Sequence, residues 1–442
     1  MDGLIARRMP PGWQLYLLIG LYPVLWGLGL AYFVWPVAAG VFVLSLCLRS
    51  AIRVPPGFGI WVLFLMWMLF SAIELSTAQQ AGLFAWRAVI YLTATGVFLW
   101  IYNASAGDLP DDTVAGALTV LWALAVVGGL VGVFDPTFSF HTLGEALVPK
   151  SVLNNPTAYA YVHPALAQIQ FKALGHPIGR PITLFAYTNQ WAATVGVLTP
   201  FAVITTLRSR SPMIRKGMLI LFAIAAIPII VSINRGLWIA LITAAIFVGV
   251  RLAAARHARL LMGGGAVALV LAAIILVSPL GHLADQRVSS SHNSNGTRAT
   301  LYSDTFSGTS KSPLFGFGTP RASANLSSTA NVRVGTQGQF YLILFSHGYP
   351  GLVFYLGWFG FTFLLALRRR SLDEILWESV ILISFVEMMV YDFLPAAIYV
   401  VMIACALLWR RRTAEVAERQ RTAALMPPQF VFSETPSQAG AL

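Results

Sequence analysis

The chain has 442 residues, of which 57% are hydrophobic and only 10% charged, and its formal net charge is +12. Soluble domains usually carry about 25% charged residues, so this composition excludes an ordinary soluble protein and indicates an integral membrane protein. Much of the excess Lys and Arg lies in short connections between apolar runs, a placement typical of membrane topology, so we expect no nucleic-acid partner.

Apolar runs separated by polar breaks predict an all-α integral membrane fold with about twelve transmembrane helices. The runs lie near residues 13–31, 33–48, 57–76, 84–102, 113–134, 184–206, 217–233, 236–254, 260–280, 350–367, 374–392 and 395–409. In lipid every backbone N–H and C=O must be paired within the protein, and a helix does this within one segment. A shorter helix is expected at 338–347, where it leads into a turn at 348–351.

The distribution of Lys and Arg predicts how these helices are oriented. If the spans alternate, nineteen of the 29 basic residues fall on one side, which is therefore the cytoplasm and holds both termini. Residues 1–410 then form one polytopic membrane domain, with large outer loops at about 135–183 and 281–338, the second of them before the tenth span. Residues 411–442 are expected to form a disordered cytoplasmic tail, because the chain beyond 421 is polar and contains proline.

The outer stretch 281–338 is polar and rich in Gly and Ser, and so long a connection is uncommon unless it has a function or is disordered. Arginines gather here and at neighbouring span ends, where topology disfavours them. Arg87 and Arg235 lie at or inside span ends. An ionised side chain at that depth is by default a functional hypothesis, and the alternative is that it extends to the lipid headgroups or pairs with a nearby acid.

The arginine guanidinium binds phosphate through two parallel hydrogen bonds and stays charged at any relevant pH. An isoprenoid pyrophosphate would place its apolar tail in the bilayer and its two phosphates at the interface, where these arginines are expected. Anionic lipid or a small organic anion would also fit such cations. The pattern therefore indicates an anionic ligand at the outer surface without naming it.

Several sequence motifs occur in a fixed order near these arginines. They are RPITLFAYTN, with Arg180 and Asn189; SINRGLW, with Asn234 and Arg235; RATLY followed by PLFGFG, with Arg298 and Tyr302; and FYLILFSHGYPGLVFYLGWF at 340–359. This ordered set resembles the O-antigen ligase and polysaccharide polymerase superfamily (Wzy/WaaL-type, GT-C-like integral-membrane glycosyltransferases). The resemblance covers most of residues 13–410.

The resemblance implies a glycosyltransferase that polymerises or ligates glycan units from an isoprenoid (undecaprenyl) pyrophosphate donor. It would act on the outer face of the bacterial cytoplasmic membrane, among membrane lipids, in cell-surface polysaccharide biosynthesis. A glycan or a lipid-linked molecule would be the acceptor, and no metal or other cofactor is implied. Arg235 and Arg298 would be catalytic, holding the pyrophosphate as it leaves. The residues expected to bind substrate are Arg87, Arg180, Asn189, Asn234, Tyr302 and Gln339.

One position departs from the family pattern. Family ligases carry a histidine eleven residues before the first glycine of the G-x-x-G element, and Gln337 stands there in this chain. Glutamine can hydrogen-bond a hydroxyl or a phosphate but cannot take a proton at neutral pH, so the role of general base does not transfer. We still expect Gln337 in the catalytic site. Either no strong base is needed, or the base is one of His347, Asp304, His292, Glu387 and Asp392.

Two questions stay open at this point. The missing histidine favours a polymerase over a ligase, although the superfamily is hard to divide by sequence. A lipid-linked glycan flippase or another transporter is the alternative class, because about twelve spans with both termini inside also suit a transporter. The hydropathy pattern shows no related halves, which speaks against that alternative.

Overall fold

The computed structural model describes most of the chain. The described residues are 10–48, 51–170, 177–256, 258–259, 262–265, 281, 283, 292–322, 333–368 and 371–425. Parts of three predicted features lie outside them: most of the ninth apolar run, two stretches of the outer segment 281–338, and the tail from 426.

The first apolar runs form long helices, as expected. They are α1 (Trp13–Gly27), α2 (Ala31–Cys47), α3 (Gly59–Phe70) followed by a 3₁₀ turn at Ser71–Glu74, α4 (Ala78–Asn103) and α5 (Asp111–Phe134). Local sequence sets their starts. The Thr77 hydroxyl accepts a hydrogen bond from the Gln80 amide at the beginning of α4, and two acids occupy the first turn of α5, where the helix dipole favours negative charge.

The segment between α5 and α9, which was predicted to be an outer loop, is more structured than expected. It holds three short helices, α6 (Leu143–Leu147), α7 (Lys150–Leu153) and α8 (Pro156–Val162), and two strands, β1 (Ala167–Gln170) and β2 (Ile178–Pro181). The strands pair antiparallel, with Gln168 opposite Arg180. The fold is mostly helical, as predicted, and this small two-stranded sheet is a local addition to it. Outside hydrocarbon, backbone groups can pair with water or with another strand, so strands are allowed there.

The remaining helices follow the later apolar runs. They are α9 (Thr188–Arg208), α10 (Pro212–Val231), α11 (Arg235–Ala254), α14 (His292–Thr309), α15 (Gln339–Ala366), α16 (Leu372–Glu387) and α17 (Ala396–Leu425). α14 lies inside the outer stretch that was expected to be a loop. α15 is two helices joined at Gly348, whose φ of 68° is non-helical. This break confirms the short helix predicted at 338–347.

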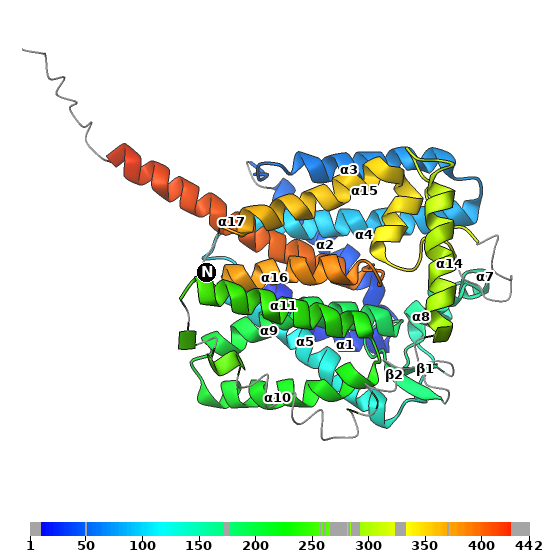
Figure 1. Ribbon diagram of the computed structural model, residues 1–442, viewed down its shortest axis with the longest axis horizontal. Helices are drawn as coiled ribbons and strands as arrows, with labels where there is room; N and C mark the ends of the chain where they lie inside the picture. The colour runs from blue at the N-terminus through cyan, green and yellow to red at the C-terminus, as the bar shows by residue number, and fades with distance from the viewer. Residues whose placement is uncertain are drawn as a thin grey trace, which may run out of the picture.

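The long helices form one bundle in which α17 is central (Figure 1). α17 packs against α4, α9 and α16, and its residues 396–409 are all buried. A helix that is apolar and buried all round belongs to a core. The far part of α17 lies at one end of the bundle, whereas α7, α8, α14 and the two strands lie at the other (Figure 1). This arrangement suits the predicted orientation, whose sides relative to the membrane stay a prediction.

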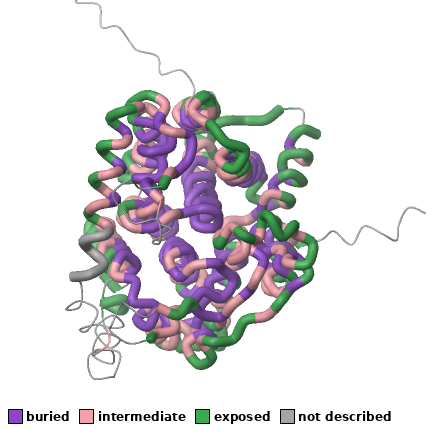
Figure 2. The backbone as a smooth tube through the Cα atoms, turned by 90° about the vertical axis from the view of Figure 1, so that its right-hand side faces the viewer, coloured by how far each residue is buried: buried purple, intermediate pink, exposed green. Residues whose placement is uncertain are grey.

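Six of the described helices, α4, α5, α9, α10, α11 and α15, are long and apolar enough to cross a membrane. Large apolar side chains such as Ile220, Ile246 and Leu364 are exposed on their outward faces. Figure 2 shows the same division, with buried residues inside the bundle and exposed residues around it. An apolar exterior of this kind is typical of a surface that faces lipid. The number of about twelve spans stays a prediction.

α17 continues well past residue 410, where the membrane domain was expected to end. Residues 411–425 are helical, so the prediction of a disordered tail is wrong for this part of the chain. The stretch is rich in Ala, Arg and Glu, which are strong helix formers. Arg410 and Arg411 also pair with Asp111 at the start of α5, which fixes the beginning of the extension.

Asp373 is a buried acid that joins three helices at this end of the bundle. It lies in the first turn of α16, is 2% exposed, and accepts hydrogen bonds from Arg208 on α9 and Arg411 on α17. Asp112, on α5, also pairs with Arg208, but its side chain is 68% exposed. The two acids therefore share a partner and differ in burial.

We expect Asp373→Ala to lower the free energy of unfolding by about 3 kcal/mol, because two guanidinium groups lose a buried partner. Asp112→Ala removes the same charge from an exposed pair and should cost less than about 1 kcal/mol. Unfolding of the purified protein, titrated from mild detergent into SDS, measures both changes. Equal losses for the two variants would contradict this role of Asp373.

Candidate active site

The turn between α16 and α17, residues 388–395, joins the helix ends that carry the sequence motifs. The backbone N–H of Gln339, at the start of α15, donates to the carbonyl of Tyr391 at 2.7 Å. The N–H of Leu237, in the first turn of α11, donates to the Tyr391 hydroxyl at 3.2 Å. The Gln190 amide of α9 donates to a carbonyl of the same turn at 2.8 Å. The starts of three helices, α9, α11 and α15, are thus bonded to the turn between α16 and α17, which sequence motifs did not single out.

Gly236 allows α11 to approach this turn closely. A Cβ atom at position 236 would lie 2.8 Å from the hydroxyl of Tyr391 and 2.5 Å from the side chain of Val390. Those distances are shorter than van der Waals contact, so a larger residue would displace the turn. The glycine that follows Arg235 in the SINRGLW motif therefore has a packing role that brings the start of α11 against Tyr391.

Arg180, on β2, is held in place by protein groups at every nitrogen of its guanidinium. Nε donates to the carbonyl of Ser232 at 2.6 Å, Nη2 to Oδ1 of Asn234 at 2.6 Å, and Nη1 to the side chain of Gln170. Asn234 is 3% exposed and in turn donates to the carbonyl of Thr188 at 3.1 Å. The first two motifs are thus bonded to each other. These contacts favour a positioning role for Arg180 and Asn234 over direct substrate binding.

The turn at 232–234, to which Arg180 is hydrogen-bonded, leads directly into Arg235. Ile233, within it, has a φ of +48°, a conformation that β-branched residues rarely adopt and that the surrounding hydrogen bonds must maintain. Arg235 is the first residue of α11 and is half-buried. Its position is therefore determined by the β2 strand, the turn and the Gly236 contact together.

α14 brings the third motif to the same place. Its Tyr302 ring stacks on Tyr341 of α15 with 4.2 Å between centroids, which fixes one helix against the other. Arg298, one turn earlier, is half-buried and lies within electrostatic range of the Tyr391 phenol, as does Arg180. Three arginine-bearing segments, distant in sequence, therefore converge on the 388–395 turn. Tyr302 itself is used in packing.

A second group of charges lies at the other side of this turn. Arg87, on α4, interacts electrostatically with Asp392 and Tyr161 and is close enough to Arg333 to feel its repulsion. Its Nη1 atom is buried and makes no hydrogen bond to any described residue. A buried donor without a partner is costly. Arg87 is thus a candidate for contact with an anionic ligand.

The two glutamines occupy different environments. Gln339 is fully buried: its side chain donates to the Tyr91 hydroxyl at 2.8 Å and accepts from the backbone of Phe393 at 3.3 Å. It therefore joins α4, α15 and the turn inside the core, which disfavours the predicted substrate contact. Gln337 is half-buried and bonded only weakly to Thr336, at 3.4 Å, so it stays a candidate for the site. Asn189, in the first turn of α9, is also half-buried.

Two of the candidate general bases are enclosed in the core. His347 is 2% exposed, and its Nδ1 lies 2.7 Å from the Ser71 hydroxyl. Glu387 is fully buried, and a Cβ atom on Gly196 would lie 2.5 Å from its Oε1. A base must reach the proton that it removes, so this geometry disfavours both. Asp304 and Asp392 stay candidates for the general base. The His292 side chain lies outside the described part of the structure.

The PLFGFG and HGYPG stretches form a structural clamp. Because α15 breaks at Gly348, the carbonyls of Phe345 and Ser346 lose their helical partners. The N–H groups of Phe317 and Gly318 donate to these carbonyls at 2.9 and 2.8 Å. These two motifs are therefore bonded to each other, and they hold the chain that follows α14 against α15. Their glycines serve architecture rather than phosphate binding.

The chain has no cysteine/histidine spacing of the kind that binds metal, yet the segment between α5 and α9 brings three possible metal ligands together. His141, Glu145 and His163 each offer one ligand atom, and these atoms lie within 4.8 Å of one another. The hydrogen bond with His163, supported by the one with His141, lowers the pKa of the Glu145 carboxyl. The four-residue spacing of His141 and Glu145 was the local signal of this cluster, whereas His163 joins it through folding.

The long apolar helices and the apolar exterior define a multi-pass membrane protein. A family model described as O-Antigen ligase matches residues 220–356, a range that includes Arg235, Arg298 and Gln337. The match covers less than half of the chain and agrees with the resemblance seen in the motifs that lie within this range. The match supports a membrane enzyme of polysaccharide synthesis. No curated protein matches the chain.

Proposed function

We propose that the chain transfers glycan from an isoprenoid (undecaprenyl) pyrophosphate donor to a glycan or lipid-linked acceptor. The reaction takes place at the outer face of the bacterial cytoplasmic membrane, during cell-surface polysaccharide synthesis. The observation that carries the proposal is the convergence of Arg180, Arg235 and Arg298, from three separate segments, on the turn around Tyr391. Cations at the outer ends of membrane helices suit an anionic headgroup on an apolar tail.

In this scheme the acceptor hydroxyl attacks the sugar carbon while the bond from the sugar to the pyrophosphate breaks, and the hydroxyl proton passes to Asp392 or to the departing pyrophosphate. Negative charge develops on the leaving pyrophosphate, and Arg235 and Arg298 stabilise it because they are already in place. Arg180 acts through the turn that holds Arg235 and is therefore a positioning residue. The fixed guanidinium groups supply the positive charge, so the scheme needs neither a metal ion nor a nucleotide sugar.

The second group of charges, which includes Arg87 and Asp392, suits contact with a donor phosphate and an acceptor hydroxyl. Arg87 has a buried Nη1 without a hydrogen-bond partner among the described residues, and Asp392 lies near it in the central turn. A donor phosphate oxygen would satisfy the guanidinium, and Asp392 would be within reach of an acceptor hydroxyl held beside it. Gln337, at the position of the ligase histidine, can hydrogen-bond an acceptor without removing its proton. This substitution favours a polymerase.

The purified protein, incubated with a lipid-pyrophosphate oligosaccharide and analysed by gel separation of glycans, tests the proposal. We expect a ladder of lengthening products, lost in Arg235→Lys because lysine lacks the guanidinium fork. Arg215→Lys, at the exposed start of α10, is the matched control and should keep the ladder.

A single product on an added acceptor would identify a ligase instead of a polymerase. Absence of transfer by the wild-type protein, together with movement of the donor across a liposome bilayer, would replace the enzyme by a flippase.

A further inference from the structure

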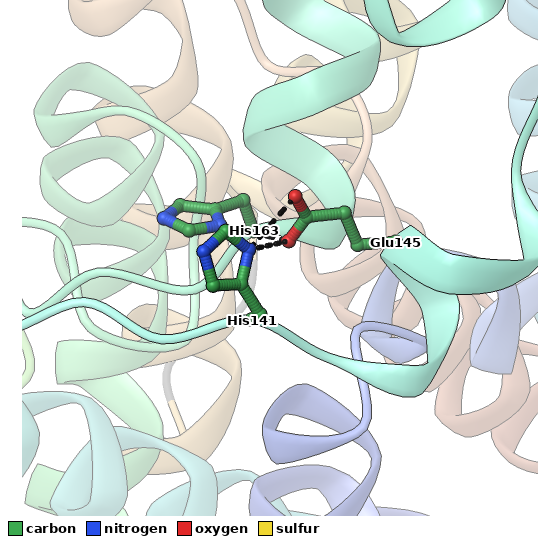
Figure 3. Close-up of side chains that lie close together, drawn as sticks. All are labelled: His141, Glu145 and His163. Atoms are coloured by element: carbon green, nitrogen blue, oxygen red, sulfur yellow. Dashed lines mark hydrogen bonds and ion pairs between the residues drawn. The ribbon is translucent and has the colours of Figure 1, made fainter. Parts of the chain in front are cut away.

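A histidine–glutamate–histidine cluster lies in the segment between α5 and α9 (Figure 3). His141 precedes α6, Glu145 lies within it, and His163 follows α8. His141 Nδ1 is 3.0 Å from Oε1 of Glu145, and His163 Nδ1 is 2.9 Å from Oε2. Both rings therefore direct the same nitrogen to one carboxylate (Figure 3).

Hydrogen bonds that do not involve the three candidate ligands hold the two chain segments of this cluster together. The Thr142 hydroxyl donates to the carbonyl of Val162 at 2.5 Å, and the Phe140 N–H donates to the carbonyl of Pro164 at 3.2 Å. Next to the cluster, the Gly144 N–H donates to the carbonyl of Leu28, which anchors α6 to the α1–α2 connection. The ligand atoms are thus brought together by the fold itself, a condition for a preformed metal site.

We propose that His141, Glu145 and His163 form a Zn²⁺ site. Two imidazoles and one carboxylate with an open fourth position are a frequent zinc ligand set, and imidazole favours zinc over magnesium or calcium. In a tetrahedral site with bonds of about 2.1 Å, neighbouring ligand atoms lie about 3.4 Å apart. The separations of 2.9 and 3.0 Å need to widen by only a few tenths of an ångström.

The exposure of the cluster fits this assignment. His141 is 84% exposed and the other two ligands are 15–16% exposed, so an ion can enter from solvent and a water molecule can fill the fourth position. The Tyr159 ring stacks on His163 with 4.7 Å between centroids, which supports the orientation of this ligand from outside the coordination shell.

Bound zinc would fix α8, which ends next to His163. Tyr161 of α8 stacks on Tyr32 with 4.0 Å between centroids and lies within electrostatic range of Arg87 and Asp392. The metal would therefore fix the position of Tyr161 relative to Arg87 and Asp392. The effect of this on substrate binding rests on the proposed function. Binding of the metal itself does not depend on that function.

Titration of the purified, Strep-tagged full chain with Zn²⁺ against a chromophoric chelator tests the site without any glycan. We expect one equivalent of zinc per chain, at least tenfold weaker binding in His141→Ala and Glu145→Gln, and no displacement by excess Mg²⁺. Asp135→Asn removes an exposed acid from the same outer segment and should bind like the wild type.

Substitution of His141 separates metal binding from folding best, because an exposed side chain contributes little to folding. Zinc should raise the thermal unfolding midpoint of the wild-type protein and leave that of His141→Ala unchanged. Absence of a saturable equivalent in the wild type, or equal affinity in all variants, would overturn the proposal. Neither result bears on glycan transfer, which is measured separately.

Discussion

Arg298→Ala is expected to reduce glycan transfer by about 100- to 1,000-fold, the range typical for loss of one fixed group that stabilises developing negative charge. Arg298 lies on α14, and Tyr302 on the same helix stacks on α15. The helix should therefore stay in place when the guanidinium is removed. The rate of product formation from the lipid-pyrophosphate donor, measured at saturating donor, reports the loss.

Lys311→Ala is the matched control because Lys311 is an exposed cation in the same outer segment. It should keep the wild-type rate within about twofold, since a solvated charge contributes little through water and salt. Both variants should reach the membrane at the wild-type level. Transfer by Arg298→Ala at the wild-type rate would remove this arginine from the mechanism, and equal losses in both variants would indicate a general effect of surface charge.

Gly348→Ala is expected to lower the free energy of unfolding by about 3 kcal/mol or more. Position 348 has a φ of +68°, and a Cβ atom there would lie 2.3 Å from the carbonyl oxygen of Leu314 and 2.5 Å from that of Pro313. Both oxygens belong to the backbone of the clamp, so neither can move without opening it. The loss should appear as a lower thermal unfolding midpoint in detergent.

Gly360→Ala provides the control within the same helix. Position 360 has helical geometry, and a Cβ atom there would meet nothing within 4 Å. Alanine is a better helix former than glycine, so this variant should be unchanged or more stable by about 0.5–1 kcal/mol. If both variants unfolded at the wild-type midpoint, the clamp formed by the PLFGFG and HGYPG stretches would not contribute to stability.

Several features of the fold could be predicted because they depend on local composition. Apolar runs of about twenty residues must form helices in lipid, and α4, α5, α9, α10 and α11 follow the predicted runs within a few residues. The break at Gly348 was also predictable, since a glycine and Pro350 interrupt the apolar pattern. The tail was mispredicted because its polar composition concealed a strong helix propensity in residues 411–425.

The roles of the candidate site residues were less predictable. Arg180 and Gln339 were expected to touch substrate, but protein groups occupy their hydrogen-bonding atoms. A motif states that a polar side chain is present and says nothing of its partners. Tyr391 lies at the centre of the site without any motif of its own, because its contacts come from α11 and α15, which are distant in sequence.

The sequence by itself determined that this is a multi-pass membrane protein that resembles the O-antigen ligase family, and which arginines to examine. These properties follow from hydropathy and from motifs that each occupy a few consecutive residues. Only the tertiary structure decided which arginines converge on the 388–395 turn, which ones hold other residues in place, and that His163 joins His141 and Glu145. Such proximity arises from long-range packing, where small shifts of helix ends determine which side chains meet.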